Sequence, residues 1–144
     1  MNESLTEFKA WCREAFEFLV RDFGFHELSE LHPNHTNNYQ ARFSNEQVEI
    51  LVLGEGYGTV ASVNYVTSKG TEVPTEILDP NWEPFIGRKK TKKGKAPTDS
   101  QHDQIFAAAR RIQERDSDIL QGSMFRLEKA ATRWRTIHEK MGWK

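Results

Sequence analysis

The sequence predicts a single α+β domain over residues 1–144: an N-terminal helix, an antiparallel β-meander of at least three strands, and two C-terminal helices packed on the sheet. Apolar residues recur at three- and four-residue spacings near both ends of the chain, and they alternate with polar residues in the middle. With 144 residues, of which 37% are hydrophobic, the chain is long enough to bury one core without disulfides or structural metal.

The first helix is predicted over residues 5–23. Ser4 followed by Glu7 is a capping-box pattern. The stripe behind it consists of Leu5, Phe8, Cys12, Ala15, Phe16, Leu19 and Phe23. Gly24 then offers a left-handed residue to close the last turn. Cys12 lies on this stripe, which indicates a packing thiol rather than a nucleophile.

Three strands are expected to follow. The first alternates through Tyr39, Ala41 and Phe43, and a second, over residues 48–53, is apolar on both faces toward its end, which indicates a central position in the sheet. Glycines at positions 54, 56 and 58 are interpreted as a turn. A phosphate-binding loop would need a helix after the glycines, whereas residues 60–66 alternate as a third strand.

Residues 68–84 are irregular and acidic, and residues 87–98 are predicted to form a basic flexible loop. Ser100 with Asp103 predicts the cap of a helix that ends near Asp116, and Gly122 is available for a positive φ in the connection that follows. The last helix is expected to pack as the final layer, and it carries an apolar stripe at three- and four-residue steps: Met124, Leu127, Ala131, Trp134, His138 and Met141.

The sequence also indicates a compartment. Cys12 is the only cysteine, so no internal disulfide can form, and neither an export signal nor an apolar run long enough for a bilayer is visible. We therefore predict a cytoplasmic protein with no membrane partner.

The charge is divided between two parts of the chain. Residues 1–87 carry a net charge of −9 and residues 88–144 a net charge of +8. In the acidic part, a surface for a basic protein is predicted from Tyr57, Glu72, Glu76, Asp79, Trp82 and Glu83, which combine negative charge with aromatic anchors.

The basic part supports an alternative, nucleic-acid binding through counterion release. Its residues are Arg88, Lys89, Lys90, Lys92, Lys93 and Lys95, which the helical Arg126, Lys129 and Arg133 would extend. No aromatic residues interleave the lysines as stacking platforms, which favours a solvated loop.

No catalytic motif, metal site or cofactor is predicted. His32 and His35 are two imidazoles in a polar loop, whereas tetrahedral zinc needs four ligands or three plus water. Asp116 and Asp118 are expected to serve a local turn rather than Mg²⁺. We therefore expect a protein that is not an enzyme, although an active site assembled from distant residues would be invisible in the sequence.

Three segments together resemble small bacterial proteins of the immunity type. They are Phe16-x-Phe18-Leu19-Val20-x-Asp22-Phe23-Gly24-Phe25, the stretch from Tyr39 to Asn45, and Asp118-Ile119-Leu120-Gln121-Gly122 leading into Phe125-x-Leu127-Glu128. The lysine-rich residues 88–95 depart from that pattern. The resemblance implies a non-enzymatic protein-binding module, an immunity protein that neutralises a basic bacterial toxin through the acidic surface. The alternative is a nucleic-acid-binding accessory protein. The partner's identity, the oligomeric state and the pairing of the two charged parts stay open.

Overall fold

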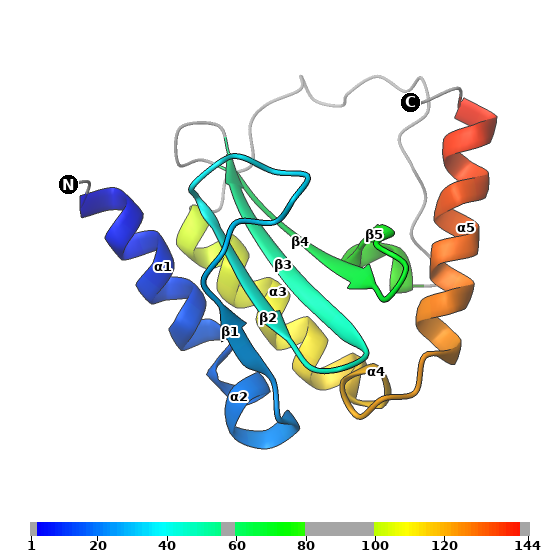
Figure 1. Cartoon of the computed structure of the whole chain (residues 1–144), viewed down its shortest axis with the longest axis horizontal. Coiled ribbons are helices and arrows are strands. Elements are labelled where there is room, and N and C mark those ends of the chain that lie inside the picture. The colour runs from blue at the N-terminus through cyan, green and yellow to red at the C-terminus, as the bar shows by residue number, and fades with distance from the viewer. Residues whose placement is uncertain (1–2, 56–59, 80–99, 142–144) are drawn as a thin grey trace.

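The computed structural model describes residues 3–55, 60–79 and 100–141, and within them it confirms the predicted α+β class (Figure 1). The elements are, in chain order, α1 (Glu3–Ala15), α2 (Glu17–Phe23), β1 (His26–Leu28), β2 (Gln40–Ser44), β3 (Val48–Glu55), β4 (Val60–Thr67), β5 (Glu72–Pro74), the 3₁₀ helix η1 (Thr75–Leu78), α3 (Gln101–Arg115), α4 (Ser117–Leu120) and α5 (Phe125–Met141). None of these helices is long and apolar enough to cross a bilayer.

The five strands form one antiparallel sheet in the order β1-β2-β3-β4-β5. The predicted central position of β3 is confirmed. Asn45 follows β2 directly and stabilises the turn between β2 and β3, because its Oδ1 accepts hydrogen bonds from the backbone N–H groups of Gln47 and Val48. In the register that results, Ile50 of β3 lies between Phe43 and Tyr65, and all three are buried in the main core.

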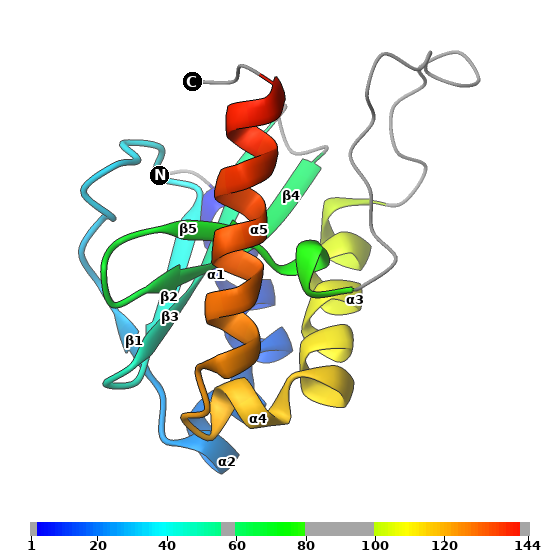
Figure 2. The ribbon, with the colours of Figure 1, turned by 90° about the vertical axis from the view of Figure 1, so that its right-hand side faces the viewer.

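Two long helices, α1 and α3, cover one face of the sheet, and α5 runs along β5 and η1 (Figures 1 and 2). Phe8 and Cys12 of α1 and Ile105 and Ile112 of α3 are fully buried in the main core. Leu127 of α5 belongs to the same core. The α1–α3 side of the sheet is called the covered face below, and the opposite side is called the open face.

The predicted N-terminal helix is in fact two helices, because the chain breaks at Phe16. The φ and ψ of this residue are −106° and 18°, and its side chain is fully buried, 5.7 Å from Phe43 between ring centroids. After the break α2 takes a new direction, and both Phe18 and Leu19 become buried. The predicted left-handed end is confirmed at Gly24, whose φ is 73°.

Two short strands and one glycine differ from the prediction. β1 was not expected, and the stretch interpreted as irregular contains β5 and η1. Gly54 belongs to β3 rather than to the turn, because β3 continues to Glu55. The other glycines of that turn, at positions 56 and 58, and the predicted loop at 87–98 lie outside the described residues.

The C-terminal elements meet at Asp116, which is fully buried between α3 and α4. Its carboxylate accepts hydrogen bonds from the hydroxyl of Tyr65 at 2.6 Å and from the guanidinium groups of Arg115 and Arg126. Three donors satisfy this carboxylate, so its role is to join β4, α3 and α5. The cap expected at Ser100 is present, because its Oγ accepts from Asp103 N–H, and Gly122 has the expected positive φ, 106°. The cap predicted at Ser4 is wrong: α1 already begins at Glu3, and Ser4 Oγ is instead hydrogen-bonded with the Tyr39 hydroxyl.

Candidate functional site

The open face of the sheet carries a small apolar cluster and a ring of polar groups. Leu51, Leu53 and Val66 are buried there, apart from the main core. The connection between β1 and β2, residues 29–39, is tied to this face by two side chains of β2. Arg42 donates to the carbonyl oxygen of Glu30, and Gln40 bonds to backbone groups of the turn that carries the histidines. Two histidines of the connection are thereby brought over the sheet.

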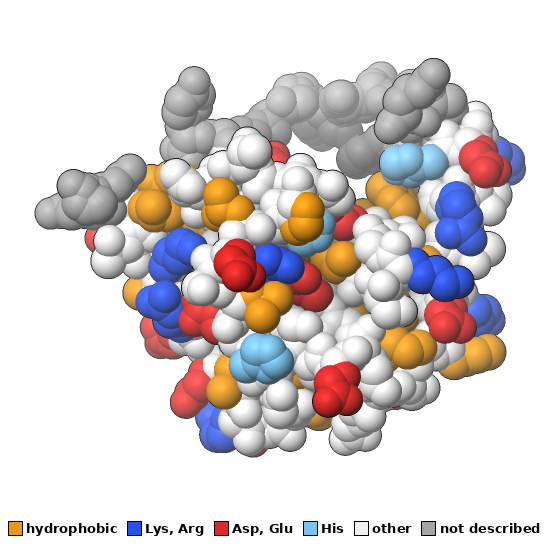
Figure 3. Space-filling model, viewed as in Figure 1, with side chains coloured by type: hydrophobic (Ala, Val, Ile, Leu, Met, Phe, Trp, Pro, Cys, Tyr) orange, Lys and Arg blue, Asp and Glu red, His pale blue; other side chains and the backbone are white. Residues whose placement is uncertain are grey.

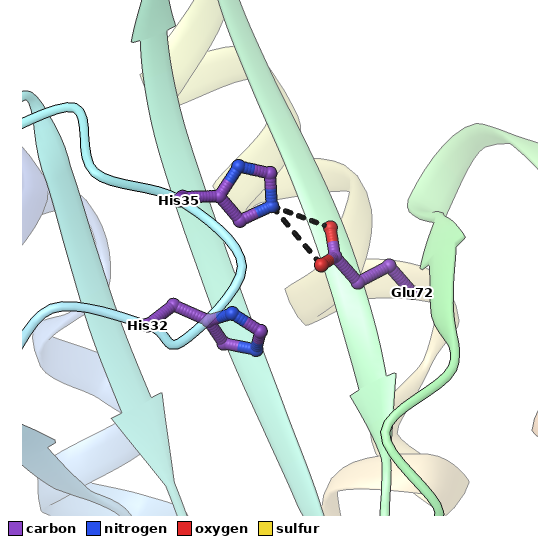
Figure 4. Close-up of side chains that lie close together, drawn as sticks. All are labelled: His32, His35 and Glu72. Atoms are coloured by element: carbon purple, nitrogen blue, oxygen red, sulfur yellow. Dashed lines mark hydrogen bonds and ion pairs between the residues drawn. The ribbon is translucent and has the colours of Figure 1, made fainter.

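His32 and His35 project from this connection toward Glu72 of β5, and we call these three residues the His–Glu cluster (Figure 4). Nε2 of His35 lies 2.9 and 3.0 Å from the two carboxylate oxygens of Glu72. One ligand-type atom from each of the three residues lies within 4.8 Å of the other two. The sequence predicted a pair of imidazoles, and the fold supplies a carboxylate 37 residues away from His35.

The buried side chain of Gln40 fixes the turn that carries His32 and His35. Its side chain is only 1% exposed, and its Oε1 accepts from the backbone N–H of His32 at 2.7 Å. Its Nε2 donates to the carbonyl oxygens of His35 and Asn37. A buried amide that makes three hydrogen bonds to one turn fixes the backbone of that turn, so both imidazoles start from a defined position.

The immediate surroundings define how accessible the cluster is. His32 is 7% exposed, whereas the side chains of His35 and Glu72 are 28% and 21% exposed. Nδ1 of His32 accepts a hydrogen bond from the backbone N–H of Asn34 at 3.1 Å. This bond places a lone pair on Nδ1 and the proton of the neutral ring on Nε2. The cluster is therefore shielded on the His32 side and reachable by solvent on the Glu72 side.

A second feature is a groove of about 430 Å³ between η1 and α5, called the α5 groove. Its lining residues are Ile77, Leu78, Arg115, Phe125, Arg126, Lys129, Ala130 and Arg133. Phe125 is 68% exposed, and Nζ of Lys129 lies 5.3 Å from the centroid of its ring. Four cationic side chains thus surround an apolar floor. The sequence identified three of these cations, but it did not place Phe125 beside them.

The predicted acidic surface is not gathered in one place by the described residues. Glu72 faces His35 on the open face, whereas Glu76 lies in a hollow beside Arg111 of α3, the helix on the covered face. Asp79 is exposed at the end of η1. On the open face and on the side of α5, acidic and basic side chains are interspersed (Figure 3).

The remaining residues of the two predicted surfaces lie outside the described part. They are Tyr57, Trp82 and Glu83 of the acidic surface and Arg88, Lys89, Lys90, Lys92, Lys93 and Lys95 of the basic loop. Comparison with known proteins adds no further assignment: no family model, no curated protein and no solved structure matches the chain.

Proposed function

We propose that this chain is a non-enzymatic protein-binding module that holds an acidic segment of its partner in the α5 groove. The observation that carries the proposal is the lining of the groove, where cationic side chains surround an apolar floor. A peptide segment with carboxylates beside one large apolar side chain matches both properties. Such a segment would place its apolar side chain against Ile77, Leu78 and Phe125.

The apolar part of the groove supports binding through burial. Phe125 is the most exposed of the large hydrophobic residues identified in the described part of the chain. Covering its ring removes apolar surface from water, which contributes about 25 cal/mol per Å². Aromatic and arginine side chains at the centre of an interface also carry a large share of the binding energy in protein complexes.

The cationic part of the groove supports selectivity for carboxylates. Arg115 and Arg126 pair with the buried Asp116, and Arg126 also pairs with Asp118, so their guanidinium groups are fixed before a partner arrives and lose little conformational entropy on binding. Because these carboxylates offset the charge of both arginines, the net positive charge of the groove comes from α5. Lys129 and Arg133 line the same groove from α5. Positive charge at this position attracts an acidic partner and raises the rate of association.

This proposal keeps the predicted class of function, protein binding, but it uses a different surface. The prediction of an immunity protein that neutralises a basic toxin stays a prediction, because its acidic residues are either divided between the two faces or outside the described part. The nucleic-acid alternative shares Lys129 and Arg133 with the α5 groove, so the test must separate an acidic peptide from a polyanion.

Selection from a random peptide display library on the immobilised protein tests the proposal. We expect selected peptides to be enriched in Asp and Glu around one Leu or Phe. Phe125→Ala and Lys129→Glu should each weaken binding of the selected peptides by about tenfold or more, as hot-spot substitutions do. Arg21→Glu is the matched control, because Arg21 is an exposed cation on α2, far from α5 in Figure 1.

Two results would contradict the proposal. In the first, the selected peptides are not enriched in Asp and Glu, or they bind the Phe125→Ala and Lys129→Glu variants as tightly as the unaltered protein. The other is tight binding of a single-stranded oligonucleotide that falls steeply with salt and is lost in Lys129→Glu, which would assign the groove to nucleic acid instead.

A further inference from the structure

We propose that the His–Glu cluster is a binding site for a divalent transition-metal ion, with Zn²⁺ as the first candidate. His32, His35 and Glu72 would supply two imidazole nitrogens and a carboxylate oxygen, and solvent would supply the remaining ligand. The site lies on the open face and does not depend on the function proposed for the α5 groove.

The ligand types indicate which class of ion fits. Two imidazoles with one carboxylate are a donor set for zinc and similar first-row ions, whereas Mg²⁺ and Ca²⁺ prefer oxygen ligands alone. Three protein ligands with one open position are typical of zinc sites that keep a water molecule. The partial exposure of His35 and Glu72 leaves a route for the ion and for that water.

The surroundings are built to hold the ligands. Gln40, which is itself buried, fixes the backbone at both histidines through one hydrogen bond to each, and a third hydrogen bond goes to the carbonyl oxygen of Asn37. On the other side, Glu72 lies directly opposite Val66 in the register of β4 and β5, so its position is fixed by the sheet. Ligands that start from fixed positions lose less conformational freedom when they bind an ion.

Two local adjustments must accompany binding. The ligand atoms, now within 4.8 Å of one another, must close in until each is about 2 Å from the ion. In addition, Nδ1 of His32 must give up its hydrogen bond from Asn34. A metal on Nδ1 replaces that bond directly, and a metal on Nε2 moves the ring proton to Nδ1, which can then no longer accept.

The ion also replaces the hydrogen between His35 and Glu72. Without metal, the short contact between Nε2 and the carboxylate requires a hydrogen bond from the ring. An ion bound between the two takes the place of this hydrogen and keeps the connection between residues 29–39 and β5. His35 and Glu72 thus bond to each other in the metal-free form, and with His32 they become ligands in the metal-bound form.

Titration of the EDTA-treated full-length protein with Zn²⁺ by calorimetry tests the site. We expect one equivalent to bind and the thermal unfolding temperature to rise, because a ligand that binds only the folded state stabilises it. His32→Gln, His35→Gln and Glu72→Gln should each weaken binding by about tenfold or more. His26→Gln and Glu76→Gln are the matched controls, since both residues are exposed and outside the cluster.

A second measurement on the unaltered protein does not depend on the variants folding. The chain has five histidines, and in a long-range ¹H–¹⁵N spectrum Zn²⁺ should change the ring signals of His32 and His35. The other three histidines should keep their signals. Absence of stoichiometric zinc binding would overturn the proposal, and so would binding that changes the rings of other histidines while those of His32 and His35 stay the same.

Discussion

Gly54 is a position where the space beside the backbone, rather than backbone conformation, requires glycine. A Cβ atom added here would lie 2.8 Å from Cε1 of Phe8 and 2.9 Å from Nε2 of Gln101. Gly54→Ala should therefore lower the free energy of unfolding by about 1–3 kcal/mol, as overpacking of a core does. Replacing a glycine within a strand would otherwise favour folding, so the sign of the effect is diagnostic.

Chemical denaturation of a double-mutant cycle provides the control. In a Phe8→Leu background, the added methyl group meets a smaller side chain, so Gly54→Ala should cost less than it does alone. An effect of equal size in both backgrounds would show that the Phe8 ring is not the obstacle.

Leu19 tests the packing of α2 at the same scale. Its side chain is fully buried, and Leu19→Ala should lower the free energy of unfolding by about 2–5 kcal/mol. The neighbouring Val20 is 48% exposed, so Val20→Ala is the matched control and should cost much less. Equal denaturation midpoints for the two variants would contradict the orientation of α2.

Cys12 links burial to reactivity. Burial is the main cause that raises the pKa of the Cys12 thiol from 9.0 to about 12. The native protein should therefore resist alkylation near pH 8 and react fully only when it is unfolded. Because the folded-state pKa is the higher one, this thiol contributes stability that is complete below pH 9 and is lost as the pH rises toward 12. Prompt alkylation of the native protein would contradict its burial.

At the scale of elements, the sequence predicted the long segments well and the short ones poorly. The helices at both ends and the strands β2, β3 and β4 repeat their apolar pattern several times, so the period is recognisable. β1 and β5 have three residues each, which is too few to show an alternation. The break at Phe16 could not be predicted either, because the apolar stripe continues through it and the burial of Phe16 against Phe43 is a contact between distant segments.

The start of α3 gives a prediction at this scale. Ser100→Ala removes the hydrogen bond from Asp103 N–H and should cost about 1 kcal/mol. The same turn of α3 also contacts the start of β4, because Gln101 Nε2 donates to the carbonyl oxygen of Val60. Because Ser100→Ala leaves the Asp103 amide without its acceptor, hydrogen exchange at this amide should become faster and the denaturation midpoint should fall. Ser29→Ala, at an exposed serine outside the helices and strands, is the control, and an equal effect there would argue against the cap.

At the scale of the whole molecule, the candidate sites depend on contacts that no local pattern contains. The His-x-x-His spacing is visible in the sequence, but Glu72 joins it only because four strand pairings bring β5 and the β1–β2 connection to the same face. In the α5 groove, Phe125 shares α5 with Arg126, Lys129 and Arg133, but Arg115 of α3 and the apolar residues of η1 join them only through tertiary packing. Both sites combine residues that the sequence had assigned to separate features.

The charge division of the chain also has a structural counterpart. Within the acidic part, Arg42 pairs with Glu49, and within the basic part, Arg115 pairs with Asp116. Contacts between the two parts include hydrogen bonds to neutral groups, such as that of Arg115 to the carbonyl oxygen of Thr75. The fold therefore joins the two parts through more than the attraction of their opposite net charges.

The hydroxyl of Tyr65, in the acidic part, donates to Asp116 in the basic part. Burial, followed by the charge of Asp116, raises the pKa of Tyr65 well above 10.0. The stability this tyrosine provides is complete below pH 10 and should fall as the pH rises above that value. Tyr65→Phe should cost about 1.5–3 kcal/mol at neutral pH and reduce the alkaline loss, measured by denaturation at each pH.

Asp116→Asn provides the comparison that separates the hydrogen bond from the charge. This variant keeps an oxygen for the Tyr65 hydroxyl but removes the negative charge that faces Arg115 and Arg126. Arg126 keeps its ion pair with Asp118, but the partly buried Arg115 loses its carboxylate partner. The free energy of unfolding should therefore fall by about 3–5 kcal/mol, more than for Tyr65→Phe. The reverse order would mean that the hydroxyl, rather than the two guanidinium groups, is the main partner of this carboxylate, and that α5 is held to α3 by other contacts.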